Sequence, residues 1–233
     1  MFHSLQEEDY PRRAAMWAEL IDQIESANLI NKILFSDEAT FRTRGKVNWH
    51  KCCVWADDKP PNFLEWEREA PKVNVWLGMS QSKVCGPFFF GEAMVTGPVY
   101  LDMLEQFLEP KLLTDGILDK VVFQQDETPC HYAIIVRHYL DRCFPDHWIG
   151  RGGTQPWTEG SPDLKPSDFF AWVFIKSEVY IGRRIGDLAE LRNHIIDAVH
   201  KITLQMLESV FRETVYRFEL CRDIDGRHVN TNK

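Results

Sequence analysis

The sequence predicts a mixed α/β domain in which helices pack on a central sheet. Three observations support this prediction. Short apolar runs with strand character fill residues 32–90, strand and helix patterns then alternate, and amphipathic helix patterns fill the C-terminal third. A chain of 233 residues with 44% hydrophobic residues can bury a substantial core, as one large domain or two small ones.

The N-terminal segment predicts an amphipathic helix over residues 11–26, in which Pro11 suits the first turn. Its apolar residues recur at helical spacing: Trp17, Leu20, Ile21 and Ile24. We expect three regions: an N-terminal helical arm (1–30), a main α/β domain (31–225) and a polar tail (226–233).

Residues 32–90 predict three to five strands, mostly antiparallel. The first apolar run, residues 33–35, is expected to end at Asp37, with Glu38 beside it. Gly45 lies between two extended stretches and predicts a hairpin tip. Residues 73–78 and 84–90 predict two further strands joined by a turn.

The middle of the chain alternates helix and strand. Gly97-Pro98 predicts the start of a helix that runs to residue 113. The apolar run 121–125 then predicts a strand buried on both faces, which ends in Asp126. A helix over residues 131–144 and a short strand over 147–149 follow.

The last part predicts a long loop and three helices. The loop, residues 150–166, is rich in Gly and Pro and carries Trp157, an unusual residue for a disordered segment. One helix is expected to start at Ser167. The next begins with a capping box, Asp187 with Glu190 three residues later, and a final helix covers residues 203–220.

Charge and cysteine usage limit the classes of function. The net charge of −8 argues against tight, autonomous binding to DNA phosphates. No apolar run approaches the roughly 20 residues that a membrane span needs. The six cysteines form no C-x-x-C pair, which indicates reduced thiols and an intracellular protein.

Three acids are expected at boundaries of secondary structure: Asp37 and Asp126 after strands, and Asp168 in the first turn of a helix. If the two strands are neighbours, Asp37 and Asp126 lie side by side, and the long loop allows Asp168 to join them. Clustered carboxylates resist ionising together unless a cation is present, and Mg²⁺ prefers oxygen ligands. Alternatively, Asp126 is an ordinary turn residue at the end of a strand.

Other catalytic chemistries fit less well. The sequence contains no G-x-S-x-G and no G-x-x-x-x-G-K-[ST] motif. Cys130 and His131 are adjacent, which is poor geometry for a nucleophile and its base. A phosphatase with Asp37 as nucleophile is conceivable, but no phosphate-binding glycine loop accompanies it.

Five motifs follow one another in order along the chain: FSDEATF (35–41), KVNVW (72–76), FQQD with Pro129 and His131 (123–131), WIGRGG (148–153) and SPDLKPSDFF (161–170). In this order they resemble the catalytic domain of mariner-type transposases over nearly the whole chain. The resemblance implies a ribonuclease H-like fold, two bound Mg²⁺ or Mn²⁺ ions, cleavage and strand transfer at transposon DNA ends, and a nuclear location.

The resemblance also implies roles for particular residues. Asp37 and Asp126 match the first two metal-binding catalytic acids, and Asp168 matches the third. Asp163 is the second choice for the third acid, or else shapes the turn before the helix. His131 is expected to orient Asp126 or a substrate phosphate, or to be an ordinary residue at a helix start.

The sequence departs from the family pattern in ways that leave two hypotheses open. Glu127 and Glu159 add acids beside the expected metal site and DNA path, and the helix over residues 11–26 cannot replace the DNA-reading domains of such transposases. One hypothesis is an active DNA endonuclease and strand transferase, as a homodimer or with a partner that supplies DNA binding. The other is a relic or co-opted module that binds nucleic acid or protein without transposition, and we favour present behaviour of this second kind.

Overall fold

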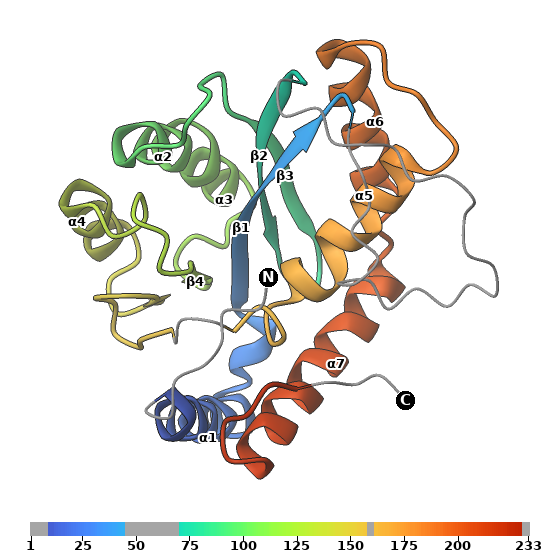
Figure 1. The fold of residues 1–233 in the computed structure, drawn as a ribbon. Helices are drawn as coiled ribbons and strands as arrows, with labels where there is room; N and C mark the ends of the chain where they lie inside the picture. The colour runs from blue at the N-terminus through green and yellow to red at the C-terminus, as the bar shows by residue number, and fades with distance from the viewer. Residues whose placement is uncertain (1–8, 45–69, 158–160, 230–233) are drawn as a thin grey trace.

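The computed structural model describes residues 9–44, 70–157 and 161–229 (Figure 1). Within these ranges five strands form one mixed sheet in the order β3-β2-β1-β4-β5. The hairpin tip predicted at Gly45 lies outside the described residues. The strands are β1 (Ile33–Arg42), β2 (Lys72–Met79), β3 (Val84–Phe89), β4 (Val122–Gln124) and β5 (Trp148–Ile149).

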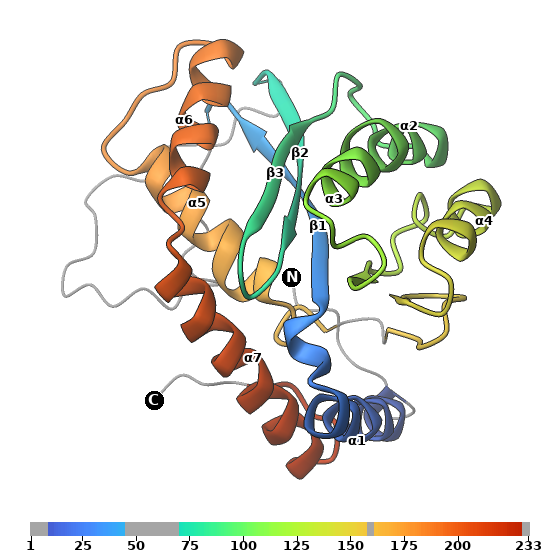
Figure 2. The same ribbon diagram turned by 180° about the vertical axis from the view of Figure 1, so that it is seen from behind.

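Helices cover both faces of the sheet. One group, α2 to α4, lies on one side, and α5 and α6 lie on the other with α7 below them (Figures 1 and 2). Short π-helical segments join α2 to α3 (Leu104–Leu108) and precede α5 (Ser167–Ala171). None of the helices in the described ranges is long and apolar enough to cross a membrane. The helices are α1 (Asp9–Ala27), α2 (Gly97–Met103), α3 (Glu109–Thr114), α4 (Ile134–Cys143), α5 (Trp172–Tyr180), α6 (Leu188–His200) and α7 (Leu204–Asp223).

Strand β1 lies at the centre of the sheet and separates two hydrophobic cores. It pairs with β2 in antiparallel fashion and with β4 in parallel fashion. Successive side chains of a strand point to opposite faces, so Ile33 and Phe35 belong to the core under α5 to α7, whereas Leu34 belongs to the core under α2 to α4. Both cores therefore depend on the same apolar run.

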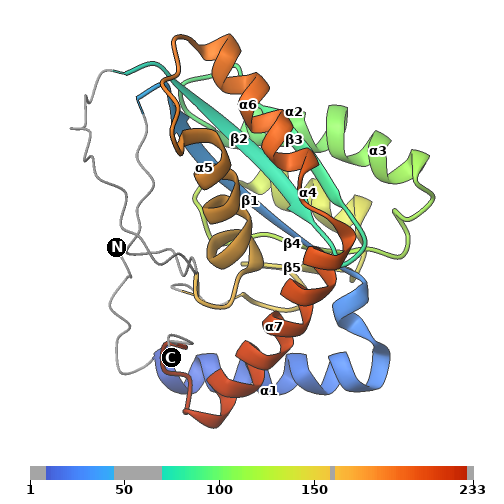
Figure 3. The same ribbon diagram turned by 90° about the vertical axis from the view of Figure 1, so that its right-hand side faces the viewer.

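Helix α1 packs across the lower end of α7 (Figure 3). The Trp17 ring stacks on Phe218 with the ring centroids 4.3 Å apart. Trp157 meets Trp17 edge to face at 5.1 Å and is only 3% exposed. The aromatic residue noted in the long loop thus fixes that loop to the core.

The structure corrects one predicted boundary. Strand β1 does not end before Asp37 but continues to Arg42, and Asp37 pairs with Leu77 of β2. The apolar pattern weakens after Phe35 because the parallel pairing with β4 stops there, at Gln124. Beyond that point one side of β1 has no neighbouring strand among the described residues.

The other expected elements are confirmed within a few residues. Helix α4 begins at Ile134, three residues later than expected, because residues 129–132 form turns. The cap of α6 is present, since Asp187 Oδ1 accepts a hydrogen bond from the Glu190 amide at 2.8 Å. The carboxylate of Glu190 accepts from the Gly186 amide, one residue earlier than a capping box requires.

The far end of β1 is fastened by Tyr180 at the end of α5. Its hydroxyl donates to the Arg42 carbonyl at 2.8 Å and accepts from the Arg42 amide at 3.0 Å. Burial raises the pKa of Tyr180 to about 12. The folded state therefore holds the hydroxyl proton more tightly than the unfolded chain, whose tyrosines titrate near pH 10.

We predict that Tyr180→Phe lowers the free energy of unfolding by about 1–3 kcal/mol at pH 8, because two backbone groups of Arg42 lose their partner. The exposed Tyr216 supplies the control, as Tyr216→Phe. The raised pKa also sets the direction of the pH dependence: this stabilisation is complete below pH 10 and is lost as pH rises toward 12. Urea unfolding from pH 8 to pH 11 measures both, and a gap between wild type and Tyr180→Phe that widens with pH contradicts the assignment.

Candidate active site

Two of the predicted acids lie at the same edge of the sheet. The parallel pairing of β1 with β4 ends at Phe35 and Gln124, and each acid follows two residues later. Asp37 continues along β1, whereas Asp126 stands in the loop after β4. The structure thus brings Asp37 and Asp126 to the same edge of the sheet, where the carboxyl ends of parallel strands meet.

A lysine ammonium joins the two carboxylates. Lys165 Nζ lies 2.9 Å from Asp37 Oδ1 and 3.0 Å from Asp126 Oδ2. The Lys165 side chain is 3% exposed, so water cannot take its place unless the surrounding structure rearranges. Burial alone would lower the pKa of Lys165, but Asp37, Asp126 and Asp168 raise it well above its usual value. The lysine is therefore charged.

Asp37 is the enclosed member of the pair. Its side chain is 9% exposed, against 30% for Asp126. Its second oxygen, Oδ2, accepts a hydrogen bond from Trp172 Nε1 at 2.8 Å, so the first turn of α5 holds one side of this carboxylate. A solvent molecule or a ligand would thus approach the pair from the side of Asp126.

Asp126 is held in its loop by neighbours in sequence. Its Oδ1 accepts from the Thr128 amide at 3.0 Å and from the Thr128 hydroxyl at 2.6 Å, which is the hydrogen bonding of an Asx turn. The same oxygen lies 2.8 Å from His131 Nδ1. Burial alone would raise the pKa of Asp126, but Lys165 and His131 outweigh it and keep the carboxyl ionised.

His131 bridges two acids from different strands. Its Nδ1 faces Asp126, and its Nε2 lies 3.1 Å from Glu38 Oε2. Glu38 reaches His131 because it points to the opposite face of β1 from Asp37. Burial would lower the pKa of His131, yet Glu38, the Tyr100 ring 4.2 Å away and Asp126 raise it. The expectation that His131 contacts the second acid agrees with this geometry.

Asp168 lies in the π-helical segment before α5 and is half-buried. It acts on Lys165 electrostatically, which places it near the pair. Within residues 9–44, 70–157 and 161–229, however, no three His, Cys, Asp or Glu side chains are arranged to hold a metal ion. The three-acid metal site, with Asp168 as third ligand, stays a prediction.

Asp163 occupies a different position, in a buried ion pair with Arg13 of α1. The Arg13 Nη2 atom donates to both Asp163 oxygens, at 3.0 and 3.3 Å, and the Val229 amide donates to Asp163 Oδ2 at 2.8 Å. Arg13 also donates to Ser161 Oγ at 2.6 Å and to the Gly226 carbonyl at 2.8 Å. In this arrangement Asp163 ties the loop before Lys165 to both ends of the chain.

Metal ions of the implied kind fit the donor chemistry but not the arrangement. Mg²⁺ and Mn²⁺ take carboxylate oxygens at about 2 Å, and Asp37 and Asp126 offer them. The position between the two carboxylates is already taken by the Lys165 ammonium. An ion could bridge the two acids only after Lys165 had moved, so the residues as arranged do not fit a bridging metal.

Sequence reasoning missed Lys165, Glu38 and Trp172 as parts of the site. Strand alternation could have placed Glu38 on the face opposite Asp37. Trp172 lies in the helix that was expected to start at Ser167, but the sequence pattern gives no sign of its hydrogen bond to Asp37. Lys165 gave no local signal, because a single lysine between Leu164 and Pro166 is indistinguishable from a surface residue until the fold is known.

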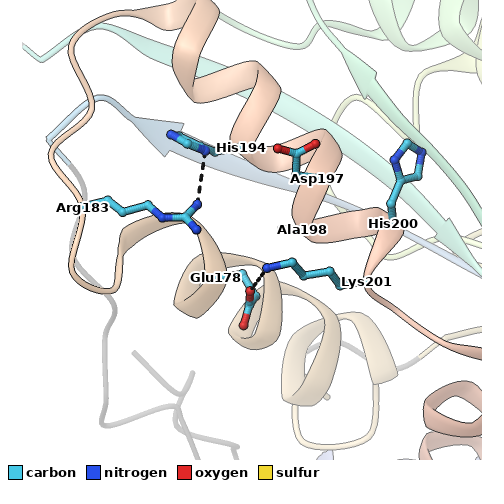
Figure 4. A pocket seen from close by; sticks show the side chains of 7 residues that line it. All are labelled: Glu178, Arg183, His194, Asp197, Ala198, His200 and Lys201. Carbon is cyan, nitrogen blue, oxygen red and sulfur yellow. Dashed lines mark hydrogen bonds and ion pairs between the residues drawn. The ribbon is translucent and has the colours of Figure 1, made fainter.

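A surface hollow between α5 and α6 lies apart from these acids (Figure 4). Four of its side chains form two pairs: Lys201 Nζ lies 2.6 Å from Glu178 Oε2, and Arg183 Nη1 lies 3.2 Å from His194 Nδ1. The first pair joins α5 to the end of α6, and the second joins the loop between these helices to α6; Asp197 and His200 also line the hollow.

The structure can be compared with known proteins at this point. No protein-family model and no curated protein matches the sequence. Solved structures do match. The catalytic domain of Mos1 mariner transposase has a TM-score of 0.74 at 19% identity, and the match covers 99% of this chain and 100% of that one. The chain has the ribonuclease H-like fold of that catalytic domain.

Complexes of the longer Mos1 chain match equally well. The Mos1 paired-end complex with the left transposon end gives a TM-score of 0.79 at 20% identity, over 98% of this chain and 65% of that one. The Mos1 paired-end complex with Mn gives 0.80 at 19% identity, over 99% and 66%. This chain therefore spans about 65% of the length of those Mos1 chains. At identities of 19–20%, these TM-scores of 0.74 to 0.80 support the resemblance in fold that was expected from the motifs.

We predict that Asp163→Ala lowers the free energy of unfolding by about 3–5 kcal/mol, because it leaves the buried Arg13 guanidinium without its carboxylate. Urea unfolding at pH 7 measures the change. Asp119→Ala, at an exposed position, serves as the control with a change near zero. Equal small effects of the two substitutions would show that Asp163 does not anchor the loop.

Proposed function

We propose that this chain is a transposase-derived domain that binds DNA, with metal-dependent DNA cleavage and strand transfer as the ancestral activity. The observation that carries the proposal is the combination of a matching fold over 98–99% of the chain with Asp37 and Asp126 side by side at one edge of the sheet. Two of the matching Mos1 structures are paired-end complexes, one with the left transposon end and one with Mn. A nuclear location belongs to the same proposal.

A cationic and aromatic surface beside the site suits a DNA strand. Tyr132 directly follows His131 and is 37% exposed. The guanidinium of Arg137 lies 4.4 Å from the centre of its ring, and that of Arg151 lies 4.2 Å from it. Aromatic rings and arginines together stack on bases and attract phosphates. This surface offsets locally the unfavourable net charge of −8.

One atom of this surface has no partner within the described protein. Arg137 Nε is buried and makes no hydrogen bond to any described residue. A buried donor without an acceptor is costly, and a phosphate oxygen would satisfy it once Arg137 repacks so that this atom is reached. We therefore place the DNA backbone along Arg137 and Arg151, next to the open side of Asp126.

We predict that Arg137→Ala combined with Arg151→Ala weakens binding of a short duplex by about tenfold or more at low salt, because stacking and phosphate contacts are lost together. Fluorescence anisotropy with labelled duplexes and single strands measures this. Arg142→Ala, in the same helix, is the matched control, because Arg142 is 73% exposed and lies over Tyr139 instead. No measurable binding by the wild type, or equal loss in the control, would overturn the proposal.

A second candidate function is retained DNA cleavage. It is favoured by the neighbouring positions of Asp37 and Asp126. Nicking of supercoiled plasmid in Mg²⁺ or Mn²⁺, compared between wild type and Asp126→Asn, separates the candidates. We expect the two proteins to nick equally little, whereas cleavage that Asp126→Asn abolishes would establish the second candidate.

A further inference from the structure

The Lys165 ammonium occupies the place where a cation shared by Asp37 and Asp126 would sit. It contacts one oxygen of each acid, Asp37 Oδ1 at 2.9 Å and Asp126 Oδ2 at 3.0 Å. Both contacts are as short as charge-assisted hydrogen bonds ordinarily are. The mutual repulsion of the two carboxylates, which otherwise calls for a divalent ion, is thus relieved by a side chain of the protein.

The remaining carboxylate oxygens also have protein donors. Asp37 Oδ2 accepts from Trp172 Nε1 at 2.8 Å. Asp126 Oδ1 accepts from the Thr128 amide and hydroxyl, and His131 Nδ1 lies 2.8 Å away. All four oxygens of the two acids are therefore engaged within the chain. An ion that bound them would have to displace several of these donors at once.

Lys165 is fixed from behind by the backbone around it. The Asp168 and Phe169 amides both donate to the Lys165 carbonyl, at 2.9 and 3.1 Å, and begin the helical segment that leads to α5. Two residues earlier, the Asp163 carbonyl accepts from Arg217 Nη1 at 2.8 Å. The lysine therefore approaches the acids from a loop that is anchored on both sides, rather than from a free surface segment.

We infer that Lys165 is a resident cation that replaces the divalent metal between Asp37 and Asp126. The inference rests on the proposed function and refines it: the domain holds DNA near a site that keeps its acids but excludes the ion. The two charges that an ion would neutralise are neutralised by Lys165 and by His131, which also lies between Asp126 and Glu38. Removal of the lysine charge opens the position to Mg²⁺ or Mn²⁺.

The test is binding of Mn²⁺, followed by the loss of its free-ion signal in electron paramagnetic resonance. We expect no saturable binding at millimolar Mn²⁺ to the wild type or to Lys120→Asn, a control at an exposed lysine. Lys165→Asn is expected to gain a site with at least tenfold higher affinity, and the double variant with Asp126→Asn to lose it. If Lys165→Asn does not fold, Lys165→Gln keeps a long side chain without the charge.

Thermal unfolding gives a second readout that needs no DNA. The melting temperature of Lys165→Asn is expected to rise by about 5–10 °C when Mn²⁺ is present at a hundredfold excess over its dissociation constant, with no rise for the wild type. Wild-type binding of Mn²⁺ that Asp126→Asn abolishes overturns the inference, and so does an absence of binding to every Lys165 variant.

The inference and the proposed function fail separately. Anisotropy of the wild type with DNA in the absence of divalent ions tests the proposed function and is independent of Lys165. A protein that binds DNA and also binds Mn²⁺ between its acids retains the proposed function and refutes the role of Lys165. A protein that binds neither, but gains Mn²⁺ in Lys165→Asn, retains the role of Lys165 and refutes DNA binding.

Discussion

The parallel pairing of β1 with β4 is the constraint on which the site depends. It is only three residues long on each strand, yet it brings together the ends of two segments that are far apart in sequence. Asp37 and Asp126 become neighbours because each follows this pairing by two residues. Their shared position creates an electrostatic problem, since two carboxylates in partly buried surroundings repel each other. The other side chains of the site offset that repulsion.

The side chains that contact the two acids come from three different parts of the chain. Lys165 arrives from the loop before α5, His131 from the turns after β4, and Trp172 from α5 itself. The direction of every pKa shift follows from this arrangement: the acids favour the charged forms of Lys165 and His131, which in turn keep Asp126 ionised. In this network every oxygen of the two acids has a donor from the chain itself.

Much of the fold was predictable, because it rests on local patterns. The apolar run before Asp126, the cap at Asp187 and the aromatic residue in the long loop each indicated an element that the structure contains. The end of β1 was predicted wrongly, because its apolar periodicity fades where β4 no longer covers one side, although the hydrogen bonding to β2 continues. Beyond that point Ser36 and Asp37 are still buried, but they are polar, so the strand continues without an apolar signal in the sequence.

The candidate site was predictable only in its acids. Their position after apolar runs was visible in the sequence, and the resemblance to mariner transposases supplied their order. The partner that joins them was not visible, since the contact between Lys165 and Asp126 spans 39 residues and depends on how the loop folds back. The position of Asp163 was likewise not predictable from the sequence around it. A residue in a recognisable motif was considered for the site, and its place is set by Arg13, a residue near the start of the chain.

The Arg13 cluster couples the two ends of the chain to the loop that carries Lys165. The Gly226 carbonyl accepts a hydrogen bond from Arg13. Gly226 has a φ angle of +80°, and a side chain at this position would collide with the Tyr10 carbonyl. Helix α1 and the segment after α7 therefore both contact the 161–163 turn and hold it in place. Loss of the Arg13 or Val229 contacts would free the 161–163 turn, and with it the loop that carries Lys165 to the two acids.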